Sequence, residues 1–152
     1  MKYLFLFCLF TFSLFAYEKG DIIDKNLSDT LELKKDKVYV IDFFASWCGS
    51  CKKELPLITN VEKAIDKSKI EIIGIDVDKK LHKALAFQKK LKSAGHLNFR
   101  VINDTDNDIV KKFNPIGMPS LYYVKNGEII DVIIGAVDAI DEKILEDLKK
   151  IK

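Results

Sequence analysis

The sequence predicts an α/β domain in which a mixed β-sheet is flanked by helices. Apolar runs of strand length alternate along most of the chain with segments whose apolar residues recur every three or four positions, as they do in helices. Near the C-terminus, two strand-like runs instead follow each other directly across the turn KNGE. The alternation requires parallel strands connected by helices, and the hairpin adds an antiparallel edge to the sheet.

Composition indicates one domain and argues against nucleic acid as a main partner. The chain has 152 residues, of which 48% are hydrophobic, which is enough for one well-buried core. Its 25 basic and 23 acidic residues nearly balance, and no run of five or six basic residues occurs. No repeat or Pro/Gly-rich linker divides the chain after its N-terminal segment, so we expect a single domain over residues 17–152.

The N-terminal segment differs in kind from the rest of the chain. One basic residue, Lys2, precedes an apolar run over residues 3–15, and the small residue Ala16 follows it. The run is short for a membrane span and fits the apolar region of a secretory signal. We therefore expect residues 1–16 to be a signal peptide and the protein to be periplasmic or otherwise exported. The alternative is an uncleaved anchor, the one case in which we expect membrane contact.

The first part of the domain is predicted to alternate between buried strands and helices. KVYVIDFFA (37–45) is rich in β-branched and aromatic residues, which suits a buried strand. A helix is expected to begin at Cys48, where the helical period starts, and KIEIIGIDV (69–77) is the second buried strand. KKLHKALAFQKKLKSAG (79–95) is the next helix, with Gly95 as its C-terminal cap. The expected buried stripe of that helix is Leu81, Leu85, Gln88 and Leu91.

The second part of the domain adds a strand, a short helix, the hairpin and a last helix. NFRVI (98–102) is the strand, and DTDNDIVKKFN (104–114) holds acidic residues that turn the chain and cap a short helix. SLYYVKNGEIIDVIIG (120–135) forms the two hairpin strands. In DAIDEKILEDLKKI (138–151), Asp138 is the expected N-cap of an amphipathic helix.

Cys48 and Cys51 are the residues with the clearest chemical potential. The third cysteine, Cys8, lies in the N-terminal apolar run and would be removed with a signal peptide. Two cysteines three residues apart on a helix lie close enough for a disulfide, but the loop they close is too short to stabilise the fold much. Zinc is disfavoured because the rest of the domain offers only His82 and His96, without metal-ligand spacing. A reactive dithiol is therefore favoured.

The position of each cysteine on the helix predicts unequal roles. Cys48 stands at the helix start, where unpaired backbone N–H groups and the helix dipole favour its thiolate. Cys51 lies on the apolar stripe with Leu55 and Ile58, where desolvation opposes ionisation. We expect an exposed, nucleophilic Cys48 and a covered Cys51 that resolves mixed disulfides.

The segment WCGSC (47–51), at a predicted strand-to-helix turn, resembles the active site of the thioredoxin superfamily, which usually reads WCGPC. The resemblance covers nearly all of residues 27–152. It extends to GMPS, which resembles the loop of that superfamily in which a cis proline faces the dithiol. The resemblance implies a thioredoxin fold with a cis bond between Met118 and Pro119.

Finer features resemble the exported TlpA/ResA-like branch of this superfamily. Residues 79–102 would be the helix and strand that the branch inserts, and CKKELP (51–56) is similar to its segment after the second cysteine. The resemblance implies a reductant of disulfides in exported proteins, with apocytochrome c as a candidate substrate and a membrane thiol electron donor. No cofactor is expected beyond the dithiol, and the protein is expected to be a monomer. A dithiol oxidase and a non-catalytic binding module stay open as alternatives.

Two acidic residues and a docking surface complete the expected site. Asp42 matches a buried aspartate of thioredoxins, and Glu54 follows Cys51 by three positions, so either could take the proton when that thiol attacks. Each of three residues has an alternative interpretation. Asp42 could be a strand residue that reaches solvent, Glu54 an exposed helix residue, and Met118 a residue that only fills the core. The predicted catalytic residues are Cys48, Cys51, Asp42 and Glu54. The predicted substrate-binding residues are Trp47, Met118 and Pro119.

Overall fold

The structure is a computed structural model, which describes residues 16–151. Apart from Ala16, the segment expected to be a signal peptide or an anchor lies outside these residues, as does Cys8. Within the described part of the chain, no helix combines the length and the apolar character needed to cross a bilayer.

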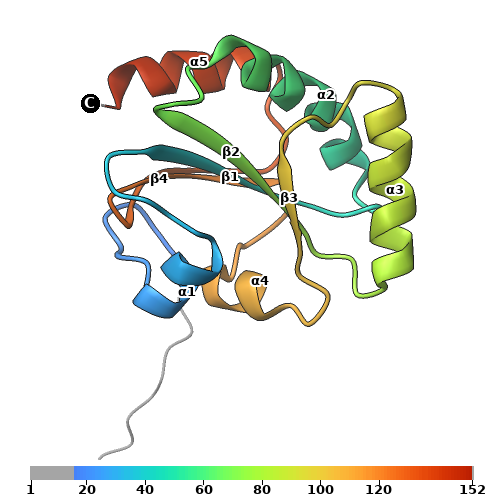
Figure 1. The fold of residues 1–152 in the computed structure, drawn as a ribbon, viewed down its shortest axis with the longest axis horizontal. Coiled ribbons are helices and arrows are strands. Elements are labelled where there is room, and N and C mark those ends of the chain that lie inside the picture. The colour runs from blue at the N-terminus through green and yellow to red at the C-terminus, as the bar shows by residue number, and fades with distance from the viewer. Residues whose placement is uncertain (1–15, 152) are drawn as a thin grey trace, which may run out of the picture.

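The core of the fold is one mixed sheet of five strands, as the sequence predicts (Figure 1). The order across the sheet is β3-β2-β1-β4-β5. β1 pairs in parallel with β2, and β2 with β3, whereas β4 and β5 form the antiparallel side. The strands are β1 (Val38–Phe44), β2 (Ile70–Asp76), β3 (Arg100–Asn103), β4 (Ser120–Lys125) and β5 (Glu128–Ile134).

Helices cover both faces of the sheet. In Figure 1, α2 and α5 lie above it and α1 and α4 below it. The ring of Phe87 in α3 contacts Phe44 in β1, whereas Phe113 in α4 contacts Phe43, so the alternation along β1 separates the two layers. Along the chain, α3 and β3 follow β2 and precede α4, which is where the resemblance places the inserted helix and strand. The helices are α1 (Lys25–Thr30), α2 (Gly49–Ala64), α3 (Leu81–Ser93), α4 (Asp108–Phe113) and α5 (Ile140–Lys150).

The first helix was not expected from the sequence. α1 is short, and only Leu27 among its residues is buried. Its N-cap, Asp24, accepts a hydrogen bond from the backbone N–H of Leu27 at 2.9 Å. That capping aspartate is the signal from which the helix could have been predicted.

The structure corrects one sequence-based expectation for α3 and confirms another. The buried face of α3 carries Ala84, Gln88 and Leu91, whereas Leu81 and Leu85 are exposed. Gln88, a member of the expected stripe, is buried and hydrogen-bonds to Asp76 and Asn103 at the ends of β2 and β3. The expected cap at Gly95 is confirmed, since it follows the last helical turn with a left-handed φ of 71°.

The start of α5 also differs from the expectation. Its N-cap is Ala139, with a φ of 51°, and no side chain caps the helix, so the prediction of Asp138 as N-cap is wrong. The backbone N–H of Val137 is held by Glu54 of α2 at 2.9 Å. This tertiary contact and the left-handed turn at Ala139 set the path of the chain, which places Asp138 one residue ahead of the cap.

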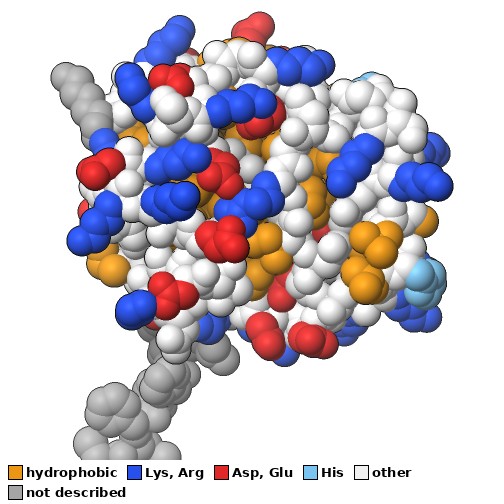
Figure 2. Space-filling view, in the orientation of Figure 1, with side chains coloured by type: hydrophobic (Ala, Val, Ile, Leu, Met, Phe, Trp, Pro, Cys, Tyr) orange, Lys and Arg blue, Asp and Glu red, His pale blue; other side chains and the backbone are white. Residues whose placement is uncertain are grey.

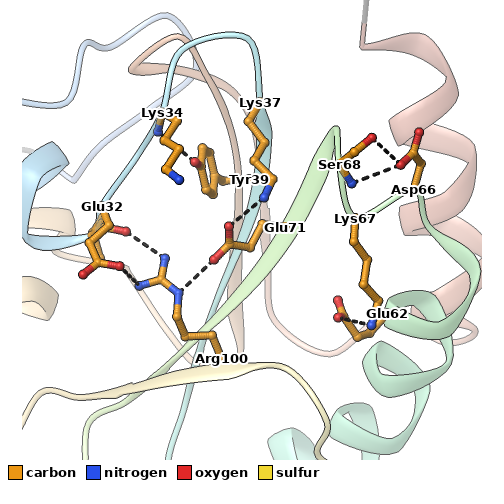
Figure 3. Close-up of polar contacts among 11 residues, drawn as sticks. Glu32, Lys34, Lys37, Tyr39, Glu62, Asp66, Lys67, Ser68, Glu71 and Arg100 are labelled. Carbon is orange, nitrogen blue, oxygen red and sulfur yellow. Dashed lines mark hydrogen bonds and ion pairs between the residues drawn. The ribbon is translucent and has the colours of Figure 1, made fainter.

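A cluster of charged residues connects the starts of the three parallel strands to the turn that follows α1 (Figure 3). Arg100, which begins β3, donates from Nε to Glu71 of β2 at 2.8 Å and from a terminal nitrogen to the carbonyl of Leu31 at 2.9 Å. Lys37, just before β1, donates to the other oxygen of Glu71 at 3.0 Å. The strands begin at this edge of the sheet, so the cluster lies opposite the edge from which Cys48 follows β1.

Replacing Arg100 with alanine is expected to lower the free energy of unfolding at pH 7 by about 1–3 kcal/mol, because charge-assisted hydrogen bonds are lost. Burial acts to raise the pKa of Glu71, but the hydrogen bonds from Lys37 and Arg100 outweigh it and lower that pKa below 4.5. A lowered acid pKa stabilises the fold above the ordinary pKa and loses this effect as pH falls. Urea unfolding at pH 7 and pH 3 measures the difference.

The control for this prediction is Lys69→Ala, which removes only an exposed pair with Asp66 at 3.8 Å. Its effect is expected to stay within about 0.5 kcal/mol at both pH values. A deficit of Arg100→Ala that is as large at pH 3 as at pH 7 would contradict the role assigned to Glu71.

Candidate active site

The two cysteines lie at the start of α2, just after the loop that follows β1. β1 ends at Phe44, and Cys48 is the N-cap of α2, as the change of period predicts. Cys48 and Cys51 form a disulfide with an S–S distance of 2.03 Å. The backbone N–H of Cys51 points to Sγ of Cys48 at 3.2 Å. The start of the helix therefore directs an N–H donor at the first sulfur, where it would also stabilise a thiolate.

The exposure of the two cysteines corrects one expectation. Cys48 was expected to be exposed, but in this disulfide form 6% of its surface is accessible, against 1% for Cys51. The bond to Cys51 covers one side of the first sulfur, and the Ser50 hydroxyl lies 3.6 Å from it. The order of exposure still matches the expected roles, because Cys48 is the more accessible residue of the two.

Asp42 is a buried acid in the middle of the sheet. It lies in β1 between Gly74 of β2 and Leu121 of β4, and only 2% of its surface is accessible. Burial raises the pKa of Asp42 to about 8, and the negative charge of Glu54 nearby raises it as well. The alternative of a strand residue that reaches solvent does not hold.

Glu54 is the second buried acid and lies in α2, one turn after Cys51. Burial raises the pKa of Glu54, and the hydrogen bond from the N–H of Val137 opposes this rise. A hollow of about 260 Å³ between α2 and the loop before α5 brings solvent to this side chain. The alternative of an exposed helix residue does not hold. The charge of Glu54 adds to the effect of burial on the pKa of Asp42.

The predicted cis bond between Met118 and Pro119 is confirmed. The register pairs Phe43 of β1 with Ser120 of β4, so this loop and the loop that leads to Cys48 lie at the same edge of the sheet. The carbonyl of Pro119 accepts from the N–H of Gly135 at 2.9 Å. Met118 is half-buried, and within residues 16–151 neither its backbone N–H nor its carbonyl is hydrogen-bonded. Its backbone is thus free to pair with an extended peptide.

A polar network behind the active-site loop was not predicted. Asp78 accepts two hydrogen bonds from Ser46, from the N–H at 2.8 Å and from the hydroxyl at 2.9 Å. Asp76 accepts from Gln88 of α3 at 2.8 Å, and Gln88 also donates to Asn103 of β3 at 2.6 Å. Burial raises the pKa of Asp76. The two acids at and just after the end of β2 are visible in the sequence as IDVD, but their partners, Gln88 for Asp76 and Ser46 for Asp78, lie far away along the chain.

Metal ligands do not gather in the described part of the chain, where no three His, Cys, Asp or Glu side chains lie close enough to hold an ion. His82 and His96 are both exposed.

Trp47 is also exposed, with 66% of its surface accessible, directly beside Cys48. The arrangement is therefore a disulfide at the start of α2, one buried acid each in β1 and α2, and an exposed tryptophan next to Cys48.

The sequence matches the AhpC/TSA family over residues 11–133. Thiol-disulfide oxidoreductase ResA of Bacillus thuringiensis is 31% identical over 124 residues, which are 80% of this chain and 68% of that protein. ResA of Bacillus subtilis is 28% identical over 104 residues, which are 68% of this chain. The match spans only 56% of the length of this second relative.

Solved structures show the same fold. A protein described as thiol:disulfide interchange protein DsbE from Chlorobium tepidum superposes with a TM-score of 0.73 at 22% identity, covering 89% of this chain and 98% of that one. StoA from Bacillus subtilis superposes with a TM-score of 0.63 at 25% identity, covering 77% of this chain and 83% of that one. The family match, the ResA relatives and the cysteine pair at the start of α2 agree: the chain belongs to the AhpC/TSA family of the thioredoxin superfamily and is a ResA-like thiol–disulfide oxidoreductase.

Proposed function

We propose that this protein is an exported reductant of protein disulfides, in which Cys48 is the nucleophile and Cys51 resolves the mixed disulfide. The observation that carries the proposal is the disulfide between these two residues at the start of α2, accompanied by buried acids in β1 and α2. A short-range bridge of this kind adds little to stability, so its value lies in exchange.

The reaction starts from the reduced protein. The Cys48 thiolate attacks one sulfur of a substrate disulfide, a mixed disulfide forms, and the other substrate sulfur leaves as a thiolate. Cys51 then loses its proton and attacks Sγ of Cys48, which releases the second substrate sulfur. Two electrons pass to the substrate, whose two thiolates take up protons from solvent, and the protein ends with the Cys48–Cys51 disulfide. A thiol electron donor in the membrane returns it to the dithiol by the reverse sequence.

The buried acids manage the protons of the second step. A group with a pKa near the working pH exchanges protons most effectively, and burial brings the pKa of Asp42 to about 8. The charge of Glu54 acts on Asp42, and solvent reaches Glu54 through the hollow beside α5. We assign the uptake of the Cys51 proton to this pair, and its delivery to solvent to Glu54.

Substrate binding is assigned to the surface around Cys48. Trp47 supplies an exposed apolar wall, and the free backbone of Met118, fixed by Pro119, pairs with an extended segment of the substrate. The apolar run before Ala16 supports export, where protein disulfides persist. Apocytochrome c and other exported proteins with cysteines are the candidate substrates, and no cofactor other than the dithiol takes part.

The test is the reduction potential of the Cys48–Cys51 pair, combined with reduction of insulin disulfides by the reduced protein. A reductant is expected to show a potential near that of reducing thioredoxins, about −270 mV, and to reduce insulin. A potential near that of strong dithiol oxidants, about −120 mV, would favour disulfide formation as the function. A bridge that does not exchange with thiols would indicate a binding module.

A further inference from the structure

We infer that a positively charged groove beside Trp47 docks an acidic segment of the protein that exchanges disulfides with Cys48. The groove has a volume of about 440 Å³, and we call it the lysine groove. The inference rests on the proposed function, because it names the chemistry of the partner that this site receives. The residues of the lysine groove used below are Trp47, Asp78, Lys79, Lys80, Lys83 and Val110.

The charge around the lysine groove is one-sided. Residues 79–93 contain six lysines but no aspartate or glutamate, although the whole chain has a formal net charge of only +2. The rest of the chain is therefore net acidic. Figure 2 shows lysine and apolar side chains, without acidic ones, over α3 at the right of the molecule. Of these six lysines, Lys79, Lys80 and Lys83 line the groove together with Trp47.

The lysines of the groove are not neutralised by the fold. Lys79, Lys80 and Lys83 are exposed, and within the described residues none of them forms an ion pair. The one carboxylate in the lining, Asp78, is buried, and both of its oxygens accept hydrogen bonds from Ser46. Its side chain is thus turned to the active-site loop and does not pair with the three ammonium groups.

The helix dipole adds to this field. Lys79, Lys80 and Lys83 stand at the start of α3, which is the positive end of the helix, and the first turn carries no acidic residue. The N-cap, Lys80, makes no side-chain capping bond. Cations at a helix start are unfavourable for the helix, whereas anions are stabilised there. The arrangement opposes the stability of α3 and favours an anionic ligand.

The opposite side of the groove is formed by the start of α4 and contributes little negative charge. Asp104 is buried and accepts from the N–H groups of Ile109 and Val110, so it caps α4 as the sequence indicates. Asp108 lies 3.6 Å from Lys111. Asp106 is exposed, but it lies outside the lining. Three unpaired lysines therefore dominate the potential of the groove.

The shape of the site favours a protein segment over a membrane surface. The three lysines border a hollow, and a hollow of about 440 Å³ can receive side chains of a peptide, whereas a flat layer of lipid headgroups cannot fill it. Trp47 lines the groove and directly precedes Cys48 in the chain. A segment that places carboxylates on Lys79, Lys80 and Lys83 would thus lead its cysteine toward Cys48.

The first experiment measures docking without chemistry. Trp47 is the only tryptophan of the chain, so its fluorescence reports on the groove. The oxidised protein is titrated with a cysteine-free peptide that carries four glutamates, and with the same peptide carrying glutamines. The glutamate peptide is expected to bind at least about tenfold more tightly at low salt, and this preference is expected to disappear at 0.5 M salt, roughly where screening reaches a few ångströms.

The second experiment measures exchange. Each peptide is given one internal disulfide, and its reduction by the reduced protein is followed with two variants of equal charge change. In Lys79→Gln/Lys80→Gln/Lys83→Gln, the ratio of the rates for the two peptides is expected to fall about tenfold. In the control Lys34→Gln/Lys35→Gln/Lys149→Gln, which removes exposed, unpaired lysines away from Trp47, the ratio is expected to stay within about twofold.

Three results would overturn the docking site. Equal binding of both peptides would do so, and so would an equal loss in the two lysine variants, which would reflect net charge alone. Binding to phosphatidylglycerol vesicles that is lost in the groove variant, with unchanged peptide kinetics, would assign the lysines to a membrane surface. Salt-sensitive binding of the glutamate peptide without reduction of either disulfide would instead retain the docking site and contradict the proposed function.

Discussion

Replacing Cys51 with alanine is expected to stop turnover and to leave substrates attached to Cys48 as mixed disulfides. The resolving thiol acts within the same molecule, and such attack has an effective concentration of roughly 10⁵ M or more in well-oriented cases. Release of the substrate by an external thiol is correspondingly slow, so the rate of insulin reduction is expected to fall by about 10³-fold or more. Non-reducing electrophoresis and intact mass measure the trapped adducts.

The matched control is Cys48→Ala, which keeps Cys51 as the single thiol of the pair. Because Cys51 is the more buried of the two, with 1% of its surface accessible, this variant is expected to trap little or no partner. Equal trapping by both variants would show that the difference in exposure does not assign the roles of nucleophile and resolving thiol.

Replacing Asp42 with asparagine is expected to stabilise the fold at neutral pH while it slows exchange. Burial holds the pKa of Asp42 at about 8, against 3.8 for the group in an unfolded chain. Below the unfolded value both states are protonated, and stability is unaffected. As pH rises toward 8, the unfolded state ionises and the folded state does not, so the wild type loses about 1.4 kcal/mol per pH unit.

At pH 7 the asparagine variant is therefore expected to be more stable by about 2–4 kcal/mol, after part of the gain is offset by burying an amide. At pH 3 the gain is expected to vanish. Urea unfolding at both pH values measures this, and stopped-flow kinetics is expected to show exchange about 10²-fold slower, as for the loss of a proton acceptor. A stability difference that does not change with pH would refute the assignment of a raised pKa to Asp42.

The parts of the site that depend on neighbouring residues in the chain were predictable. The apolar runs, the change to a helical period at Cys48 and the three-residue spacing to Cys51 are local, so they specify the strand, the helix and the disulfide from sequence alone. The cis bond at Pro119 was predictable because a short loop sequence resembles that of a known superfamily.

The environment of the acids was not predictable in the same way. Asp42 is buried because β2 and β4 flank β1, and a strand sequence does not state which strands will pair with it. Glu54 receives its hydrogen bond from Val137, far along the chain, and Ser46 meets Asp78 only after β2 has paired with β1. Part of the buried face of α3 was misplaced for a related reason: Ala84 is buried where Leu81 and Leu85 were expected, because the side of a helix that faces the sheet depends on how the two pack.

The bond between Glu54 and the N–H of Val137 has a practical consequence for handling the protein. The loop that supplies this N–H is held in place by α5, which packs against α2 at the C-terminal end of the chain. Proteolytic clipping of that helix, or an affinity tag that displaces it, would leave both cysteines in the chain and still alter the acid behind them. An intact C-terminus, verified by mass, is thus as necessary for an activity assay as a full count of free thiols.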